Sequence, residues 1–244
     1  MSEDKIYSSD GSGEPFRFNA SVARVFPDML RRSIPGYAAS IEAIGSLAAR
    51  YVTADSNCYD LGCSLGAATL AMRQGIREPG CHIVAIDMAP AMIERCKEIV
   101  AADSRQSAAP TTVDVVEGDI RTANITNASM VVLNYTLQFL SLEDRDAVIQ
   151  RVCAGMNKGG LLVLSEKVVD ENPEMESLLC DLHHEHKRRN DYSALEISRK
   201  RAALENVLIP ESVAEHRQRL ASAGFSHSAV WLRYFNFVSI IAIR

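Results

Sequence analysis

The hydrophobic positions from about residue 57 onward form short apolar runs that alternate with stretches of helical spacing. The run from Ile83 to Ile86 is continuous, as expected for a parallel strand buried on both faces. Strands that alternate with helices in this way predict an α/β fold with a doubly wound, mostly parallel, Rossmann-like sheet. The pattern predicts strands over 57–61, 82–87, 113–117, 130–134 and 161–165, and helices over 67–75, 90–101 and 144–156.

This alternation is absent at both ends of the chain. Before the first strand, helical spacing predicts helices over 22–30 and 41–51, with a break between them at residues 33–37. Residues 1–15 are polar and rich in Ser, Gly and Asp, which predicts a flexible N-terminal arm. We expect residues 16–244 to form a single domain.

The second half of the chain adds three features to this domain. A turn is predicted at 157–160, where two glycines follow Asn and Lys. Residues 170 to about 220 contain helical patterns and no convincing strand, which predicts an inserted helical cover. Two strands near 226–234 and 237–243 are close enough to pair as an antiparallel C-terminal hairpin.

Composition narrows the class of protein. The chain has 244 residues, 47% of them hydrophobic, and a net charge of −5. No apolar run reaches the roughly 18 residues that span a bilayer, and the first residues do not resemble a secretion signal. The six cysteines are scattered, as in a reduced cytoplasmic protein. An acidic chain whose only dense basic clusters are the short runs 186–189 and 199–201 is not expected to bind nucleic acid directly. Each cluster suits either a solvated helix face or a site for an anionic ligand.

The candidate chemistry begins at the end of the first predicted strand. Asp60 is followed by Gly62 and Gly66 before a predicted helix, and Asp87 ends the next strand. Glycines allow the backbone to approach a ligand closely, and an acidic residue at the second strand end suits two ribose hydroxyls. The pattern favours a site for a nucleoside with an amino-acid tail. The alternative is a strand–turn–helix whose Asp serves as a cap.

Two later strand ends extend this candidate site. Asp119 and Ile120 follow the third strand, where a carboxylate and a backbone amide suit an adenine ring. Asn134 ends the fourth strand, and its amide suits the amino-acid part of a cofactor or a substrate. A simple turn and a helix cap are the alternatives at these two positions. The His-rich run 183–186 lacks the spacing of a zinc protease motif, so no metal is predicted.

Together these elements resemble the class I S-adenosylmethionine-dependent methyltransferase fold over most of residues 40–244. Ser64 stands where the usual first motif has glycine. Several segments are more specific and resemble the carboxy-S-adenosylmethionine synthase family nearly end to end. They are residues 25–29, 32–37, 59–69, 90–96, 128–134, 136–140, 164–167 and 195–198.

The resemblance implies an enzyme, a transferase that carboxylates its cofactor instead of using it to methylate. In that family S-adenosyl-L-methionine and prephenate give carboxy-S-adenosyl-L-methionine and phenylpyruvate. The product is the carboxymethyl donor for the 5-oxyacetyl modification of tRNA wobble uridine, which implies a functional link to a tRNA carboxymethyltransferase. The resemblance also implies a homodimer.

The resemblance further assigns a role to individual residues. Tyr37 contacts the cofactor, and Asp87 with Met88 holds its ribose. Arg201, reaching the site from the neighbouring subunit, receives the new carboxylate, because a guanidinium offers two parallel donors to a planar carboxylate. Arg32, Lys200 and Arg201 are candidates to bind prephenate, which carries two carboxylates. The full predicted set is Tyr37, Gly62, Cys63, Ser64, Asp87, Met88, Asp119, Ile120, Asn134 and Arg201.

Other functions remain open on the sequence alone. The same fold carries small-molecule methyltransferases, and a chain of this kind can also bind S-adenosylmethionine without catalysis. Direct methylation of tRNA is disfavoured by the acidic net charge.

Overall fold

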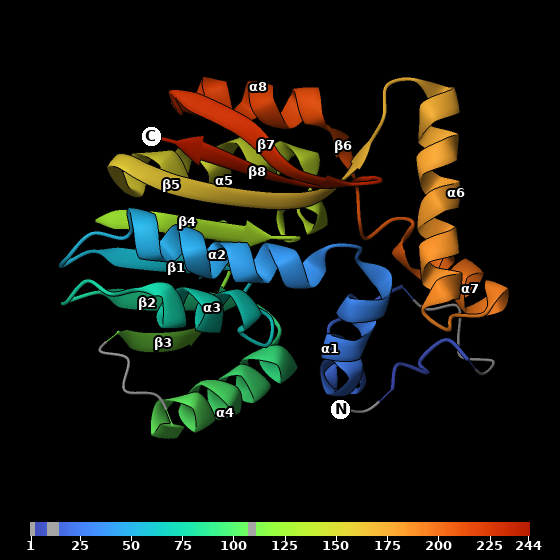
Figure 1. Cartoon of the computed structure of the whole chain (residues 1–244), viewed down its shortest axis with the longest axis horizontal. Helices are drawn as coiled ribbons and strands as arrows, with labels where there is room; N and C mark the ends of the chain where they lie inside the picture. The colour runs from blue at the N-terminus through green and yellow to red at the C-terminus, as the bar shows by residue number, and fades with distance from the viewer. Residues whose placement is uncertain (1–2, 9–14, 107–110) are drawn as a thin grey trace.

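The computed structural model describes residues 3–8, 15–106 and 111–244, and its centre is one mixed sheet (Figure 1). The strand order is β3-β2-β1-β4-β5-β8-β7, and the short β6 pairs with the end of β5. Strands β1 to β5 are parallel, whereas β8 lies antiparallel between β5 and β7. The predicted doubly wound sheet with a C-terminal hairpin is therefore confirmed. The strands are β1 (Asn57–Leu61), β2 (His82–Asp87), β3 (Thr112–Glu117), β4 (Ala128–Asn134), β5 (Met156–Val169), β6 (Glu211–Ser212), β7 (His227–Tyr234) and β8 (Phe237–Ile243).

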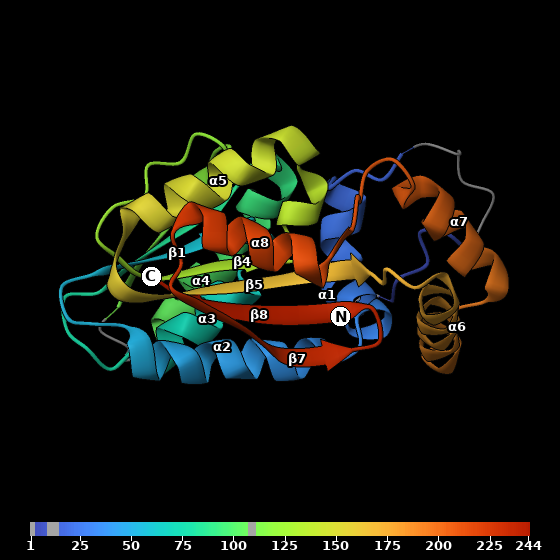
Figure 2. The same cartoon turned by 90° about the horizontal axis from the view of Figure 1, so that it is seen from above.

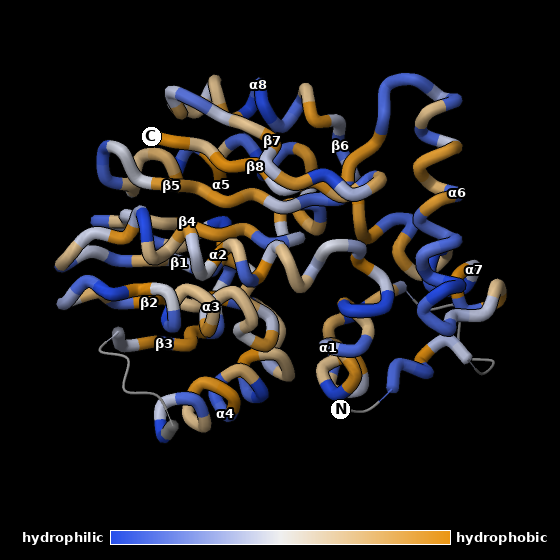
Figure 3. The backbone as a smooth tube through the Cα atoms, viewed as in Figure 1, coloured by the Kyte–Doolittle hydropathy of each residue, from blue (hydrophilic) through white to orange (hydrophobic). Residues whose placement is uncertain are grey.

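Helices cover both faces of the sheet (Figure 2). One face carries α2 (Tyr37–Tyr51), α3 (Ala67–Gly75) and α4 (Pro90–Gln106), and the other carries α5 (Leu142–Gly155) and α8 (Val213–Ala223). Strand β4 shows why its sequence is apolar throughout. Met130 and Val132 pack into the core under α2 and α3, whereas Val131 and Leu133 pack into the core under α5. Strands β4, β5 and β8 accordingly include long hydrophobic stretches of the backbone (Figure 3).

Three further helices stand at the carboxyl ends of the parallel strands, namely α1 (Ala20–Ser33), α6 (Pro173–Arg189) and α7 (Ala194–Leu204). The helical cover expected over 170 to about 220 consists of α6 and α7. Helix α8 does not belong to it, because Leu220 packs into the core beside Val148 and Val152 of α5. The short strand β6 lies between the cover and α8 and was not predicted.

The N-terminal residues that the structure describes are held against the cover. Asp4 is 1% exposed, and its carboxylate accepts a hydrogen bond from the hydroxyl of Tyr192. Its backbone N–H donates to Asp28 in α1 at 2.8 Å. The predicted flexible arm falls partly on residues 1–2 and 9–14, which lie outside the described residues. The single domain over 16–244 stays a prediction.

The turn predicted at 157–160 is wrong, because β5 already begins at Met156. Met156 pairs with Ala128, and the ladder then shifts so that Leu161 pairs with Met130. The intervening residues bulge out of the ladder and are held by the end of the chain. The N–H of Gly159 donates to the carbonyl of Arg244 at 2.9 Å. The glycines therefore serve a bulge inside one long strand.

Candidate active site

A cavity of about 550 Å³ lies between the carboxyl ends of β1, β2 and β4 and the helices α1, α6 and α7. Its volume is in the range of small-molecule sites, and ligands of open α/β sheets bind at this edge. The cavity brings together every residue of the predicted site. Lining it are Tyr37, Gly62, Cys63, Ser64, Asp87, Met88, Asp119, Ile120, Asn134 and Arg201.

The turn after β1 requires glycine at position 62. The N–H groups of Gly62 and Cys63 both donate to the carbonyl of Ile86, at 2.8 and 2.9 Å. Gly62 has a φ of 79°, and a Cβ there would lie 2.3 Å from Cγ2 of Thr136. The chain therefore turns with its backbone pressed against the loop after β4, which leaves the cavity side of the turn for a ligand.

Ser64 and Asp87 join the two loops on which a nucleoside would rest. Ser64 has a φ of 48°, in the left-handed region, which explains why glycine is usual at this position. Its N–H donates to Oδ2 of Asp87 at 2.9 Å, and the N–H of Ala89 donates to Oδ1 at 2.9 Å. Burial raises the pKa of Asp87. Each carboxylate oxygen keeps a lone pair for a ribose hydroxyl.

Asp60 places a second carboxylate under the same loop. It is 1% exposed, and its Oδ2 accepts a hydrogen bond from the hydroxyl of Thr69 at 2.6 Å. Burial raises the pKa of Asp60 to about 6. An ammonium group bound beside Asp60 would stabilise the ionised carboxylate, so this end of the cavity suits a cation.

Asp119 lines the cavity and is already paired. Oδ2 of Asp119 lies 2.6 Å from Nη2 of Arg121, and the same guanidinium reaches Asp144 at 3.1 Å. Hydrogen bonds from Arg121 lower the pKa of Asp119, so its carboxylate stays an acceptor near neutral pH. Ile120, beside it, is buried and presents an apolar surface to the cavity.

The side chain of Asn134 has a buried oxygen atom, Oδ1, without a hydrogen-bond partner among the described residues. A buried polar atom without a partner costs about 1–3 kcal/mol, so a ligand that donates to this oxygen would remove the cost. The residues present therefore fit a ligand with a ribose, an ammonium group and further donors, as S-adenosylmethionine has.

The opposite end of the cavity is basic. We call Lys167 of β5, Lys187 of α6, and Lys200 and Arg201 of α7 the basic pole; all four line the cavity. Lys200 is already engaged, because its Nζ lies 2.9 Å from the hydroxyl of Ser33 and 3.8 Å from the carboxylate of Asp4.

Arg32, a candidate for binding the substrate, is not among the residues that line the cavity. Its Nε donates to the carbonyl of Asn190 at 2.7 Å, and its guanidinium stacks 4.0 Å above the ring of Tyr192. Arg32 therefore holds α1 to the loop between α6 and α7.

Comparison with known proteins decides the family. A family model for a methyltransferase domain matches residues 53–225. The carboxy-S-adenosyl-L-methionine synthase of Vibrio campbellii is 55% identical over 99% of this chain and 97% of its own length. That of Trichlorobacter lovleyi is 53% identical over 94% of this chain and 93% of its own length. The chain belongs to the carboxy-S-adenosyl-L-methionine synthase family.

Solved structures share the fold with this member of the synthase family. A putative S-adenosyl-L-methionine-dependent methyltransferase of Methanococcus maripaludis matches with a TM-score of 0.60 and 19% identity, over 97% of this chain and 96% of that chain. Human N-acetylserotonin methyltransferase matches with a TM-score of 0.60 and 18% identity, over 98% of this chain. This chain spans only 57% of the length of the human protein. The expected class I methyltransferase fold is confirmed.

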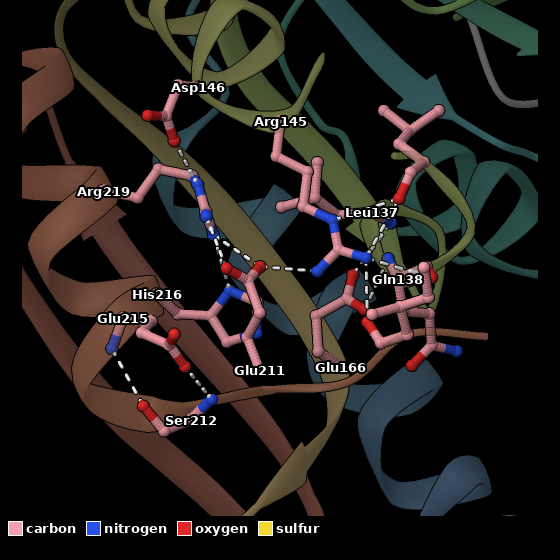
Figure 4. Close-up of polar contacts among 12 residues, drawn as sticks. Leu137, Gln138, Arg145, Asp146, Glu166, Glu211, Ser212, Glu215, His216 and Arg219 are labelled. Atoms are coloured by element: carbon pink, nitrogen blue, oxygen red, sulfur yellow. Dashed lines mark hydrogen bonds and ion pairs between the residues drawn. The ribbon is translucent and has the colours of Figure 1, made fainter. Parts of the chain in front are cut away.

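A buried polar network supports one wall of the cavity, the segment that follows Asn134 in the chain (Figure 4). The 3₁₀ turn η1 (Leu137–Phe139) is held from one side by Glu166, whose two carboxylate oxygens accept the N–H groups of Leu137 and Gln138 at 2.9 and 3.0 Å. Burial raises the pKa of Glu166 to about 8. The turn presents Gln138 and Phe139 to the cavity.

Arg145 of α5 holds the same turn from the other side. It is 0% exposed, and its guanidinium donates to the carbonyls of Gln138 and Ile209 at 3.2 and 2.8 Å. It also pairs with Glu211 of β6 at 2.5 Å, which in turn binds Arg219 of α8 at 2.6 Å. The network therefore fixes the η1 turn and the chain entering β6 to the rigid α5–α8 layer.

Several cavity residues were missed at the sequence level. Lys167 had no assigned role, although it directly follows the buried run that ends at Glu166. A lysine that continues a buried strand was the available signal. Gln138 was likewise given no role. Lys187 belongs to the basic cluster 186–189, for which a solvated helix face and a site for an anionic ligand were both left open. Within residues 3–8, 15–106 and 111–244, no three His, Cys, Asp or Glu residues gather as a metal site requires, and no helix is long and apolar enough to cross a membrane.

Proposed function

We propose that this chain converts S-adenosyl-L-methionine and prephenate to carboxy-S-adenosyl-L-methionine and phenylpyruvate. The observation that carries the proposal is that Arg201 lines the same cavity as Gly62 and Asp87. A methyltransferase leaves no charge where the methyl group departs from the sulfonium. A carboxylated product places an anion there, and a guanidinium is the side chain best shaped to bind it.

The other residues divide between the two ends of the cofactor. The Gly62–Ser64 loop, with Asp60 beneath it, would hold the amino-acid tail. Asp87 would bind the ribose hydroxyls through the lone pairs that its backbone hydrogen bonds leave free. Asp119 and Ile120 would border the adenine, and the unpaired Oδ1 of Asn134 would accept a hydrogen bond from the ligand.

The reaction balances without a metal or a redox step. Prephenate gives up its ring carboxyl group and its hydroxyl group and becomes aromatic. S-adenosylmethionine supplies a sulfonium methyl group, which loses one proton and gains the carboxyl group. The hydroxide and the proton leave as water. The protein therefore has to hold the two substrates in contact, exclude bulk water and keep carbon dioxide from escaping.

The enclosure needed for this comes from both sides of the cavity. Helices α6 and α7 close it from outside, and the buried Glu166–Arg145 network holds the η1 wall. In this single chain Arg201 lines the chain's own cavity, whereas the family resemblance implies that a neighbouring subunit supplies it.

We also propose a homodimer in a reduced cytoplasm, whose product serves a tRNA carboxymethyltransferase. Three large apolar side chains on α6 and α7 are exposed, which supports association through these helices: Met175, Leu178 and Leu195. All six cysteines are free thiols, as in a reducing compartment.

Incubation of the purified protein with both substrates tests the proposed reaction. The nucleoside product, separated and weighed, should be heavier than S-adenosylmethionine by one carbon dioxide, and phenylpyruvate should appear in equal amount. A methyltransferase would instead form S-adenosylhomocysteine once an acceptor is supplied, and a binding module would release its ligand unchanged. Either result would contradict the proposal.

A further inference from the structure

Two lysines of the basic pole, Lys187 and Lys167, make no direct ion pair within the part of the chain that the structure describes. Neither ammonium group makes a hydrogen bond with a described residue, although both line the cavity. The carboxylate of Glu176 acts on Lys167 at longer range, and its oxygens accept hydrogen bonds from the Cys180 thiol at 3.1 Å and the Asp170 N–H at 2.8 Å. Lys187 has only cations and the Cys180 thiol among the groups that act on it. The two cations are therefore available to an anion in the cavity.

Burial makes this arrangement costly for the free protein. Lys187 is only 9% exposed, and burial, followed by the nearby charges of Lys200 and Lys167, lowers the pKa of Lys187 to about 7. Burial likewise lowers the pKa of Lys167. An anion bound beside these two groups would favour their charged forms. Part of its binding energy therefore comes from offsetting the cost of burying two ammonium groups.

We infer that Lys187, together with Lys167, binds the side-chain carboxylate that prephenate retains when it becomes phenylpyruvate. This inference rests on the proposed function. The substrate has two carboxylates with different fates, because the ring carboxyl group leaves while the 2-oxo-acid side chain remains. Arg201 is already assigned to the group that is transferred, which leaves Lys187 and its neighbour Lys167 for the group that stays. The site thereby selects a 2-oxo carboxylate and holds it through the reaction.

This assignment differs from the sequence-based candidates for a physical reason. Arg32 is outside the cavity lining and Lys200 is already bound to Ser33 and Asp4, so neither offers a free charge. Lys187 comes from α6 and Lys167 from β5, and only the folded chain brings both to the cavity.

Binding of phenylpyruvate should be coupled to the uptake of a proton by Lys187. The charged or titratable groups that act on Lys187 are Lys167 of β5, Lys200 and Arg201 of α7, and Cys180 on its own helix. His183, His184 and His186, also on α6, have lowered pKa values and are neutral near pH 7. A bound carboxylate favours the ammonium form of Lys187, so affinity for phenylpyruvate should fall as pH rises above about 7.

Calorimetric binding of phenylpyruvate in the presence of S-adenosylmethionine tests the inference directly. Lys187→Met keeps the length of the side chain and removes its charge, and Lys187→Arg keeps a charge. Lys158→Met is the matched control, because Lys158 is exposed on the same strand as Lys167 and does not line the cavity. Should Lys187→Met fail to fold, Lys167→Met carries the same test.

We expect Lys187→Met to weaken phenylpyruvate binding and raise the KM for prephenate by a common factor of about 10 to 100, with the affinity for S-adenosylmethionine within about twofold. Lys187→Arg should keep most of the affinity. The methyl ester of phenylpyruvate, which lacks the charge, should bind the native protein and Lys187→Met equally. The control should behave as the native protein does.

Unchanged phenylpyruvate binding in Lys187→Met and Lys167→Met would overturn the inference, and so would native protein that binds no phenylpyruvate. A loss confined to S-adenosylmethionine would assign the lysines to the amino-acid carboxylate of that ligand, which also overturns it. Failure of the native protein to form the carboxylated product would instead contradict the proposed function. The two failures are therefore distinguishable.

Discussion

The carboxylate of Asp87 accepts a hydrogen bond from the backbone N–H of Ser64 at 2.9 Å, across 23 positions of the sequence. This contact ties the loop after β1 to the end of β2, so one side chain both shapes the cofactor loop and faces the cavity. A residue with these two roles should affect every ligand that shares the nucleoside.

Replacing Asp87 with Asn tests this double role. The amide keeps one acceptor but loses the charge, so we expect S-adenosylmethionine and carboxy-S-adenosylmethionine to bind more weakly by a similar factor of about 10 to 100. Glu117→Gln is the matched control, since Glu117 is the register partner of Asp87 on β3 and is exposed. Calorimetry with both ligands gives the comparison, and a loss confined to one ligand would refute the ribose role.

Arg201 should distinguish the same two ligands. Arg201→Ala removes the guanidinium proposed to bind the new carboxylate, so we expect affinity for the carboxylated cofactor to fall by about 10-fold or more while that for S-adenosylmethionine changes little. Arg201→Lys should restore part of the difference. Arg188→Ala, on the exposed end of α6, is the control. Equal losses for both ligands would contradict a carboxylate role.

Gly62 should tolerate no side chain. A Cβ at this position would lie 2.3 Å from Cγ2 of Thr136, so Gly62→Ala should lower the free energy of unfolding by about 2–4 kcal/mol and weaken cofactor binding. Gly159→Ala is matched in backbone strain, with a φ of 81°, but its Cβ meets nothing within 4 Å. It should lose only about 1–2 kcal/mol. Similar losses in urea unfolding of the two variants would show that the contact with Thr136 has no role.

Glu166 should make stability depend on pH. Its pKa is raised to about 8 in the folded chain, above the ordinary 4.5, so the folded state keeps a proton that the unfolded state has lost. The free energy of unfolding should therefore fall as pH rises from 4.5 to 8, by up to about 1.4 kcal/mol per pH unit from this group. Glu166→Gln should flatten that slope. Urea unfolding at several pH values measures it, and parallel slopes would contradict the raised pKa.

The order of strands and helices was readable from the sequence because burial on two faces leaves continuous apolar runs, as at Ile83–Ile86. The cofactor-side residues were predictable because Gly62, Asp87 and Asn134 all lie at strand ends, which topology brings to one edge. The basic pole was only partly predictable. The basic cluster 186–189 was compatible with a solvated face or an anion site, and only the packing of the cover helices brings Lys187 into the cavity.

Two other features were not predicted because they also depend on contacts between residues far apart in the sequence. The hydrogen bond between Tyr192 and Asp4 joins residues 188 positions apart, so a polar N-terminal segment gave no sign of a buried carboxylate. The glycines at 159 and 160 were interpreted as a turn because their sequence suits either a turn or a bulge. The partner that decides between them is Arg244, at the far end of the chain.

The most direct test of the central claim follows the carboxyl group itself. Prephenate labelled with carbon-13 in its ring carboxyl group should transfer the label into the nucleoside product, and phenylpyruvate should be unlabelled. In prephenate labelled only in the side-chain carboxylate, the label should stay in phenylpyruvate. A nucleoside product without label from the ring carboxyl group, or one identical in mass to S-adenosylmethionine, would contradict the account.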